Sequence, residues 1–241
     1  MQRMDKKIYS EHWGKETEIL NNQGIYEALS KITPKENTIE IGCGEGVTSR
    51  YLASDRKVIA IDNNKYFIEK ASKALRDMDS PPTIIHADVF ELTKENSSSI
   101  KEFSPKVVTG WFIGSHADDI DKRTDSSLTI HEKPKLYREN IENIIVGKIG
   151  AIDTVEWIHL ANRGGASAGA SEEQITQPTI DDYNTHLFLP NGYEVQEVKL
   201  LGWNRDGSDF MYVNSSNPNY MGGSAVPVVV SILARRKKSK D

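Results

Sequence analysis

Cysteine is nearly absent from this sequence, since Cys43 is the single one in 241 residues. One cysteine cannot form an internal disulfide, so a disulfide-stapled scaffold is excluded and a reducing compartment is favoured. Long apolar runs are also lacking, because the run at residues 225–234 is far too short to cross a bilayer. The first residues lack the apolar core of a secretion signal. We therefore expect a cytoplasmic protein that does not associate with membranes.

An excess of positive charge is missing too. Lysine and arginine number 30 against 35 aspartate and glutamate residues, which gives a formal charge of −5. Proteins that hold a phosphate backbone rely on a basic face that releases counterions, so we expect no DNA partner. The basic residues at 235–241 form a charged chain end, and such ends are usually solvated. The length is sufficient for a single domain over residues 1–241 that carries insertions.

Short β-branched segments alternate with segments of helical periodicity along most of the chain. Strands are predicted at residues 38–41, 57–62, 83–90, 106–114, 151–158, 193–203 and 225–236. Helices are predicted at residues 15–31 with a break near Gly24, and at 46–55, 68–78, 132–150 and 179–188, the last from a capping pattern at Thr179. No helix separates the last two strands, which should therefore pair antiparallel. The fold class is α/β, a Rossmann-like doubly wound sheet of seven strands, mostly parallel with an antiparallel last strand and helices on both faces.

Three glycines at alternate positions, Gly42, Gly44 and Gly46, follow the first predicted strand. They lie at the carboxyl edge of the predicted sheet, where open α/β sheets bind ligands. A dinucleotide fingerprint would need glycine at position 47, which is Val47, and no Lys-Ser/Thr pair follows to make a phosphate-binding loop. The remaining interpretation is a nucleoside ligand without a pyrophosphate, with a simple tight turn as the structural alternative.

Acidic residues end the next two predicted strands. The carboxylate of Asp62 can accept hydrogen bonds from both hydroxyls of a ribose, although Asp62 could instead cap the following helix. Asp88 could accept a hydrogen bond from the exocyclic amine of adenine, or only cap a turn. Val89 and Phe90 offer apolar contact beside it.

The sequence resembles the class I S-adenosylmethionine-dependent methyltransferases over most of its length. The resemblance rests on "EIGCGEG", on the acidic end of the second strand, on the Ala-Asp pair of the third, and on "PNGY" opening the last strand pair. It implies that the cofactor is S-adenosyl-L-methionine and that the glycine loop passes its methionine part. It further implies that Asp62 binds the ribose, that Asp88 with Val89 binds the adenine, and that Glu40 lies near the amino group of the cofactor.

In this family the fourth strand usually ends at the methyl acceptor, and here the corresponding segment reads "VTGWFIGSHADD". The Asn/Asp-Pro-Pro-aromatic motif of enzymes that methylate base or amide nitrogens is absent, which argues against DNA adenine methylation. His116 is the candidate general base, because neutral imidazole can take a proton at physiological pH, with a surface histidine as the alternative. His116, Asp118 and Asp119 could also bind a metal ion, but alternating charges suit a solvated segment better, and no metal is expected.

Substrate selection is expected from pieces added to a common core at residues 35–160. One piece is an N-terminal helical lid at residues 1–34, and the other is the part at 161–241, which carries insertions on the substrate side. The Gly/Ala/Ser-rich segment 159–174 is predicted to be flexible, and the long loop 204–224 to line the site or to contact a second copy in a homodimer. Arg163 could pair with an acidic acceptor. The predicted substrate-binding residues are Trp13, Trp111, Phe112 and Tyr212.

These features predict an enzyme that moves a methyl group to a small-molecule acceptor by in-line displacement. Such a reaction needs alignment and shielding more than acid–base groups, so few catalytic residues are required. The alternatives are a methyltransferase that acts on protein or RNA, and a non-catalytic protein that binds the cofactor as a scaffold. The accepting atom is left open, because fold does not determine chemistry.

Overall fold

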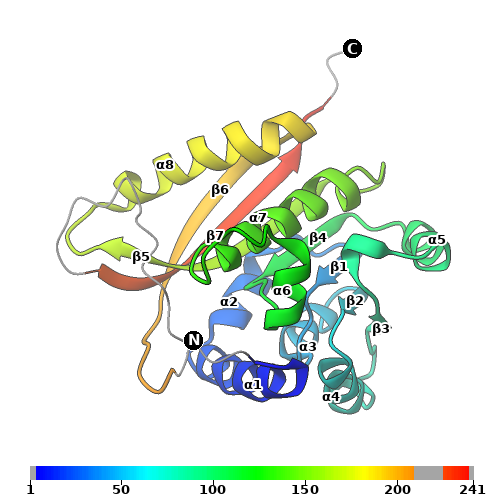
Figure 1. The fold of residues 1–241 in the computed structure, drawn as a ribbon. Helices are drawn as coiled ribbons and strands as arrows, with labels where there is room; N and C mark the ends of the chain where they lie inside the picture. Colours follow the sequence, from blue (N-terminus) through cyan, green and yellow to red (C-terminus); the bar gives the residue numbers. More distant parts are fainter. Residues whose placement is uncertain (1–3, 209–224, 239–241) are drawn as a thin grey trace.

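The computed structural model describes residues 4–208 and 225–238, and a seven-stranded sheet forms its centre (Figure 1). The strands follow the order β3-β2-β1-β4-β5-β7-β6, and β7 runs antiparallel to both of its neighbours. The predicted fold class is thereby confirmed. The strands are β1 (Thr38–Ile41), β2 (Val58–Asp62), β3 (Thr83–His86), β4 (Val107–Trp111), β5 (Trp157–Ser167), β6 (Tyr193–Gly202) and β7 (Ala225–Arg236).

Helices cover both faces of the sheet because side chains alternate along each strand. In β2, Ile59 and Ile61 join one buried apolar cluster, while Val58 and Ala60 join the other. The first cluster packs against α5 and α7, and the second against α1, α2 and α3. The helices are α1 (Lys6–Asn22), α2 (Ile25–Ile32), α3 (Val47–Ala53), α4 (Lys65–Leu75), α5 (Lys94–Phe103), α6 (Ala117–Arg123), α7 (Lys133–Ile144) and α8 (Glu172–Tyr183), with short turns η1 (Val89–Glu91), η2 (Ile145–Ile149), η3 (Asn184–Phe188) and η4 (Leu189–Asn191).

The fifth strand differs most from the sequence prediction. It was expected at residues 151–158 with a flexible segment after it, but β5 begins at Trp157 and continues through the Gly/Ala/Ser-rich residues to Ser167. The prediction of a flexible segment is wrong there because β5 pairs with β7 along its whole length, from Trp157 opposite Arg235 to Ser167 opposite Ala225. Backbone hydrogen bonds to a long partner strand outweigh a composition that is unfavourable in strands.

The helix predicted to start at Thr179 begins seven residues earlier, at Glu172. Ser171 and Gln174 form a capping box in which each side chain accepts a hydrogen bond from the other residue's backbone N–H. This reciprocal cap fixes the start of α8. The Thr179 hydroxyl instead donates to the carbonyl of Ile175 inside the helix, at 2.9 Å.

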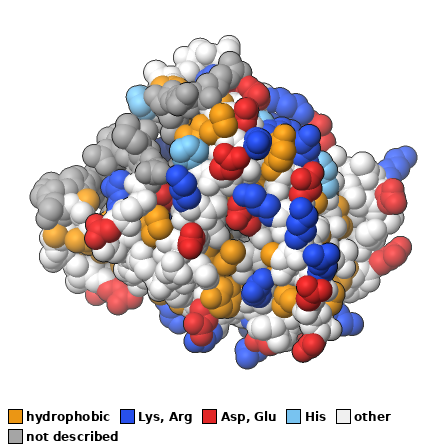
Figure 2. Space-filling model, turned by 90° about the horizontal axis from the view of Figure 1, so that it is seen from below, with side chains coloured by type: hydrophobic (Ala, Val, Ile, Leu, Met, Phe, Trp, Pro, Cys, Tyr) orange, Lys and Arg blue, Asp and Glu red, His pale blue; other side chains and the backbone are white. Residues whose placement is uncertain are grey.

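The predicted N-terminal lid, residues 1–34, forms two helices separated at Gly24, which has φ 72°. The side-chain amide of Asn64 donates to the carbonyl of Lys6 at 2.9 Å, and the Tyr51 hydroxyl donates to Asn21 at 2.9 Å. These contacts hold both ends of α1. On the face that carries α1, positive and negative side chains are interspersed (Figure 2). None of the helices in the described residues has the length and apolar character that crossing a membrane requires.

Candidate functional site

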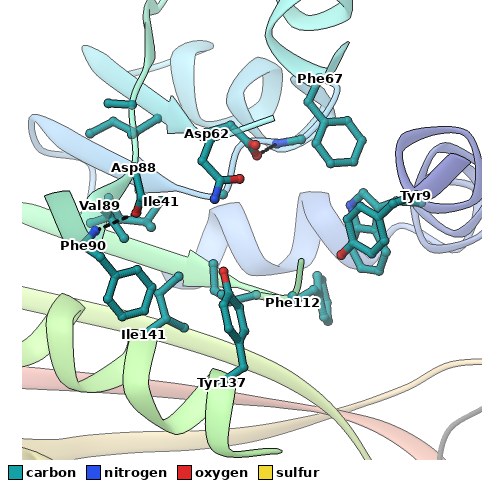
Figure 3. Close-up of a pocket in the computed structure, with 18 residues that line it drawn as sticks. Tyr9, Ile41, Asp62, Phe67, Asp88, Val89, Phe90, Phe112, Tyr137 and Ile141 are labelled. Carbon is teal, nitrogen blue, oxygen red and sulfur yellow. Dashed lines mark hydrogen bonds between the residues drawn. The ribbon is translucent and has the colours of Figure 1, made fainter. Parts of the chain in front are cut away.

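A cavity lies between the carboxyl ends of β1, β2 and β4, the turn after β3, and helices α1 and α7 (Figure 3). It encloses about 540 Å³, part of which is open to solvent. The cavity brings together seven residues that the sequence predicted for cofactor or substrate binding: Trp13, Gly42, Gly44, Asp62, Asp88, Val89 and Phe112.

Two of the three glycines expose main chain to this cavity. Gly42 and Gly44 line it with φ angles of 78° and 54°, which side-chain-bearing residues adopt rarely. A Cβ added to Gly42 would lie 2.8 Å from Cδ1 of Ile113, so a side chain there would invade the space of the cavity wall. The loop therefore exposes main-chain atoms to the cavity. The glycines in the sequence predicted such a surface for a ligand that contacts the backbone.

Gly46 has a different surrounding. It has φ 85°, and an added Cβ would lie 2.6 Å from Cδ1 of Leu75 and 3.1 Å from Cβ of Ala71. Gly46 is not among the residues that line the cavity. Its lack of a side chain allows α3 to start against α4, and a direct contact with the cofactor stays a prediction.

We expect Gly46→Ala to destabilise the protein by about 2 kcal/mol, because the new Cβ adds both backbone strain and overpacking. The matched control is Gly24→Ala, because Gly24 has a similar φ of 72° with no atom within 4 Å of the added Cβ. The free energy of unfolding in urea is measured for both variants. Gly24→Ala reports backbone strain alone, whereas Gly46→Ala reports strain and overpacking together. An equal loss in both variants would show that the contact with α4 costs nothing.

Asp62 ties the glycine loop to the start of the next helix. Its Oδ2 accepts a hydrogen bond from the backbone N–H of Gly44 at 3.0 Å, and its Oδ1 accepts from that of Asn64 at 2.8 Å. The residue that caps α4 is Asn64, not Asp62. Burial raises the pKa of the Asp62 carboxyl to about 6. Each oxygen keeps a further acceptor position, which suits the two hydroxyls of a ribose.

Glu40 lies in β1 directly before the loop, with 3% of its surface exposed. Its Oε2 accepts a hydrogen bond from the Ser49 hydroxyl at 2.5 Å, whereas no group in the described part of the chain hydrogen-bonds its Oε1. Burial raises the pKa of this carboxyl to about 7. A buried carboxylate oxygen without a partner is costly, and a cationic ligand group nearby would offset that cost.

Asp88 both caps a turn and faces the cavity. Its Oδ1 accepts from the backbone N–H of Phe90 at 3.0 Å, and its Oδ2 forms an ion pair with Arg123. The predicted strand at 83–90 ends earlier, at His86, because Asp88 caps the turn η1. The interpretation of Asp88 as a turn cap is therefore correct for the free protein. The contact with adenine stays a prediction, and it would use a remaining lone pair of the Asp88 carboxylate.

Phe112 follows β4 with φ 54°, an uncommon value for a bulky residue. Its ring packs edge-on against Tyr26 at 5.7 Å, and its backbone N–H donates to the carbonyl of Ala161 at 2.7 Å. Trp111 points elsewhere: it lines a smaller hollow of about 260 Å³ beside the glycine loop and packs edge-on against His159 at 5.1 Å. Phe112 lines both the main cavity and the smaller hollow, whereas Trp111 lines only the smaller hollow.

His116 is buried, with 3% of its surface exposed, so the interpretation as a surface histidine is wrong. Its Nδ1 accepts the backbone N–H of Asp119 at 3.3 Å and caps α6, and burial lowers its pKa. In this neutral form Nε2 carries the proton, and neither ring nitrogen is free to accept one. His116 is also not among the residues that line the cavity, so its role as a general base stays a prediction that this geometry disfavours.

The acidic residues after His116 are engaged with protein groups. Asp119 accepts hydrogen bonds from the Tyr137 hydroxyl at 2.7 Å and from the Asn63 side-chain amide at 3.1 Å. Among the residues described, no three His, Cys, Asp or Glu side chains gather in a way that could hold a metal ion. The predicted substrate residue Tyr212 lies outside the described residues.

Sequence reasoning missed the residues of α6 and α7 at the site. Tyr137 lines the cavity from α7, and Arg123 reaches Asp88 from α6. The charged segment 118–125 was predicted to be solvated, but the side chains of Asp119 and Arg123 are only 8% and 11% exposed. Their spacing of four residues on one helix is a signal for a shared face, although it does not reveal what covers that face.

Arg163, which was predicted to meet an acidic acceptor, pairs with an acid of this chain. Its Nη1 lies 2.7 Å from Oε2 of Glu16, and its guanidinium lies 4.9 Å from the ring centre of Trp13. Arg163 thus connects β5 to α1. The interpretation as an acceptor-binding residue is replaced by this intramolecular role.

Comparison with known proteins agrees with this geometry. Residues 39–102 match the family model described as a methyltransferase domain. That segment contains the glycine loop, Asp62 and Asp88. None of the curated proteins matches the chain by sequence.

Solved structures that resemble the whole chain have very different sequences. A "putative RNA methyltransferase" from Pyrococcus horikoshii is 10% identical, covers 89% of this chain and 85% of its own, and has a TM-score of 0.51. A magnesium protoporphyrin IX methyltransferase from Synechocystis, with S-adenosylmethionine bound, is 12% identical over 96% of this chain and 82% of its own, with a TM-score of 0.43. At these identities the likeness concerns the fold. By sequence, residues 39–102 therefore match a methyltransferase domain, and the chain shares its fold with the P. horikoshii structure.

Proposed function

We propose that this protein transfers the methyl group of S-adenosylmethionine to a small-molecule acceptor. The observation that carries the proposal is the cavity at the carboxyl edge of the sheet. It places the bare backbone of Gly42 and Gly44 and the carboxylates of Asp62 and Asp88 beneath the aromatic side chains of α1. The position agrees with the rule that open α/β sheets bind ligands at this edge.

The residues present fit the cofactor. Glycine backbone gives the methionine part close access, Asp62 accepts from the ribose hydroxyls, and Asp88 accepts from the adenine amine. The unpartnered Oε1 of Glu40 supplies negative charge for the ammonium group, directly or through water. When bound, the cofactor supplies an electrophilic methyl group on a sulfonium. The remaining work of the chain is to align the acceptor and to exclude water.

The acceptor end of the proposed site is aromatic. Tyr9, Trp13 and Phe112 line the cavity on the side of α1 and the end of β4. Burial, reinforced by the nearby Asp62 carboxylate, raises the pKa of the Tyr9 hydroxyl, so it stays protonated and acts as a hydrogen-bond donor. Such walls suit a flat or apolar acceptor that is small enough to lie beneath the lid helix.

RNA is the second candidate acceptor, because the P. horikoshii protein that shares this fold is named a putative RNA methyltransferase. The formal charge of −5 and the interspersed charges on the α1 face give little support for a phosphate-binding surface (Figure 2).

Labelled cofactor tests the choice between these acceptors. The protein is incubated with methyl-labelled S-adenosylmethionine and a cell lysate that has been separated by size, with and without ribonuclease. We expect label in the low-mass fraction irrespective of ribonuclease. Label in a large fraction that ribonuclease removes would make RNA the acceptor. If calorimetry showed cofactor binding but no fraction received label, the protein would be a non-catalytic scaffold that binds the cofactor.

Glu40→Gln is expected to weaken cofactor binding and to stabilise the unliganded protein above pH 7. The pKa of Glu40 is raised to about 7, so the folded state holds a proton that the unfolded state has lost above its ordinary value near 4.5. Stability is therefore lost as pH rises through this window, and neutral glutamine removes the loss. The gain at pH 8 should be on the order of 2 kcal/mol in urea unfolding.

The matched control for this variant is Glu36→Gln, on the exposed chain before β1. It should change neither the stability at pH 8 nor the affinity for S-adenosylhomocysteine. If Glu40→Gln destabilised the protein at pH 8, Glu40 would have to be held ionised by a partner, and its proposed availability to the cofactor would fail.

A further inference from the structure

The charged residues of α6 form a buried connection around the adenine end of the cavity. Arg123 lies at its centre, with 11% of its side chain exposed. Its guanidinium pairs with Asp88 and lies 3.1 Å from Glu91, both on the turn after β3. It also stacks on Phe90, with 4.4 Å between the guanidinium carbon and the ring centre.

The other side of α6 connects to the end of β2. Asp119, one helical turn before Arg123, accepts from the Asn63 side-chain amide and from the Tyr137 hydroxyl. Both Asn63 and Tyr137 line the cavity, as do Asp88 and Phe90, whereas Arg123 and Asp119 lie behind that lining. The helix thus holds cavity-lining residues from β2, β3 and α7 in fixed relative positions.

The Asp88 carboxylate is oriented by two contacts of different kinds. The backbone N–H of Phe90 holds Oδ1, and the guanidinium of Arg123 holds Oδ2. Arg123 reaches Asp88 through Nη2 alone, while its Nη1 lies 3.1 Å from Glu91 and its Nε lies 3.7 Å from Asp119. The fork of the guanidinium thus holds three carboxylates at once, which a single lysine ammonium cannot do, and Asp88 is restrained at both of its oxygens. The lone pairs that remain on Asp88 are therefore directed rather than free to rotate. Figure 3 shows the contact between Asp88 and the backbone N–H of Phe90 as a dashed line.

We propose that Arg123 is a positioning residue that makes the site selective for a 6-amino purine, acting through Asp88 and Phe90. This inference rests on the proposed function. A directed carboxylate accepts the hydrogen bond of an exocyclic amine and repels the carbonyl oxygen that replaces that amine in a 6-oxo purine. Phe90, held under the guanidinium, fixes the apolar wall beside it.

The test compares two ligands by calorimetry: S-adenosylhomocysteine and its deaminated analogue, S-inosylhomocysteine. The wild-type protein should prefer the amino compound by at least roughly tenfold, the discrimination expected from one hydrogen bond to a charged group. In Arg123→Met this preference should fall to about threefold or less, because S-adenosylhomocysteine binds more weakly while the analogue changes little. Arg123→Lys should recover only part of it.

Lys122→Met is the matched control, since Lys122 forms an exposed pair with Glu91 at 2.9 Å on the same helix. It should keep the full preference. Thermal unfolding of each variant shows whether it folds, and Arg123→Lys carries the comparison if Arg123→Met does not. A preference that survives in the Arg123 variants, or an equal loss for both ligands, would overturn the positioning role. No binding of S-adenosylhomocysteine to the wild-type protein would instead overturn the proposed function.

Discussion

Asp62→Asn is expected to reduce the affinity for S-adenosylhomocysteine by roughly 100-fold or more. The carboxylate accepts hydrogen bonds from the backbone N–H groups of Gly44 and Asn64, and it is proposed to accept two more from the ribose. Asparagine has one acceptor oxygen, so its amide N–H₂ must face a backbone or ribose donor. Losing two hydrogen bonds to a charged group costs about 3–6 kcal/mol of binding free energy. Roughly 100-fold is therefore the smallest loss of affinity that we expect.

Calorimetry with S-adenosylhomocysteine measures this loss. Because the pKa of Asp62 is raised to about 6, the wild-type affinity should also fall as the pH is lowered through 6, where the carboxyl gains a proton. If Asp62→Asn bound the ligand within threefold of wild type, the ribose would lie elsewhere and the orientation of the cofactor in the cavity would have to be revised.

Arg163→Met is expected to destabilise the protein by about 3–5 kcal/mol, the cost typical of breaking a buried ion pair from one side. Glu16, its partner, is 1% exposed and lies within α1. The guanidinium also stacks on Trp13 and lies 5.8 Å from the ring centre of Trp203, so packing is lost along with charge. Because Trp13 lines the cavity, affinity for the cofactor should fall as well.

Urea unfolding of a double-mutant cycle checks this interpretation. Adding Glu16→Gln to Arg163→Met should restore part of the stability, since the buried carboxylate is then removed. Lys31→Met is the control, because its pair with Glu27 is exposed and should contribute less than about 1 kcal/mol. Strictly additive effects of the Glu16 and Arg163 substitutions would mean that the two side chains do not stabilise one another.

The site could be predicted where its residues follow strands, and not where it depends on contacts between helices. Asp62 and Asp88 were placed correctly because the ends of adjacent parallel strands must meet at one sheet edge. Arg123 was missed, because a charged residue on a short helix indicates a solvated face until the packing of α6 is known. Arg163 was given an external partner because the residue it meets, Glu16, is 147 positions away in the sequence.

The sequence by itself determined the order of the strands, the antiparallel end of the sheet, and the loop of glycines beside acidic residues. These features depend on local periodicity, turn chemistry and chain connectivity, which are written in short stretches of residues. Only the tertiary structure decided that β5 continues through the glycine-rich segment, that His116 caps a helix, and that α6 packs against the end of the cavity lined by Asp88. Each of these depends on a partner distant in the chain, since the free energy of a buried charge or an extended strand depends on what packs against it.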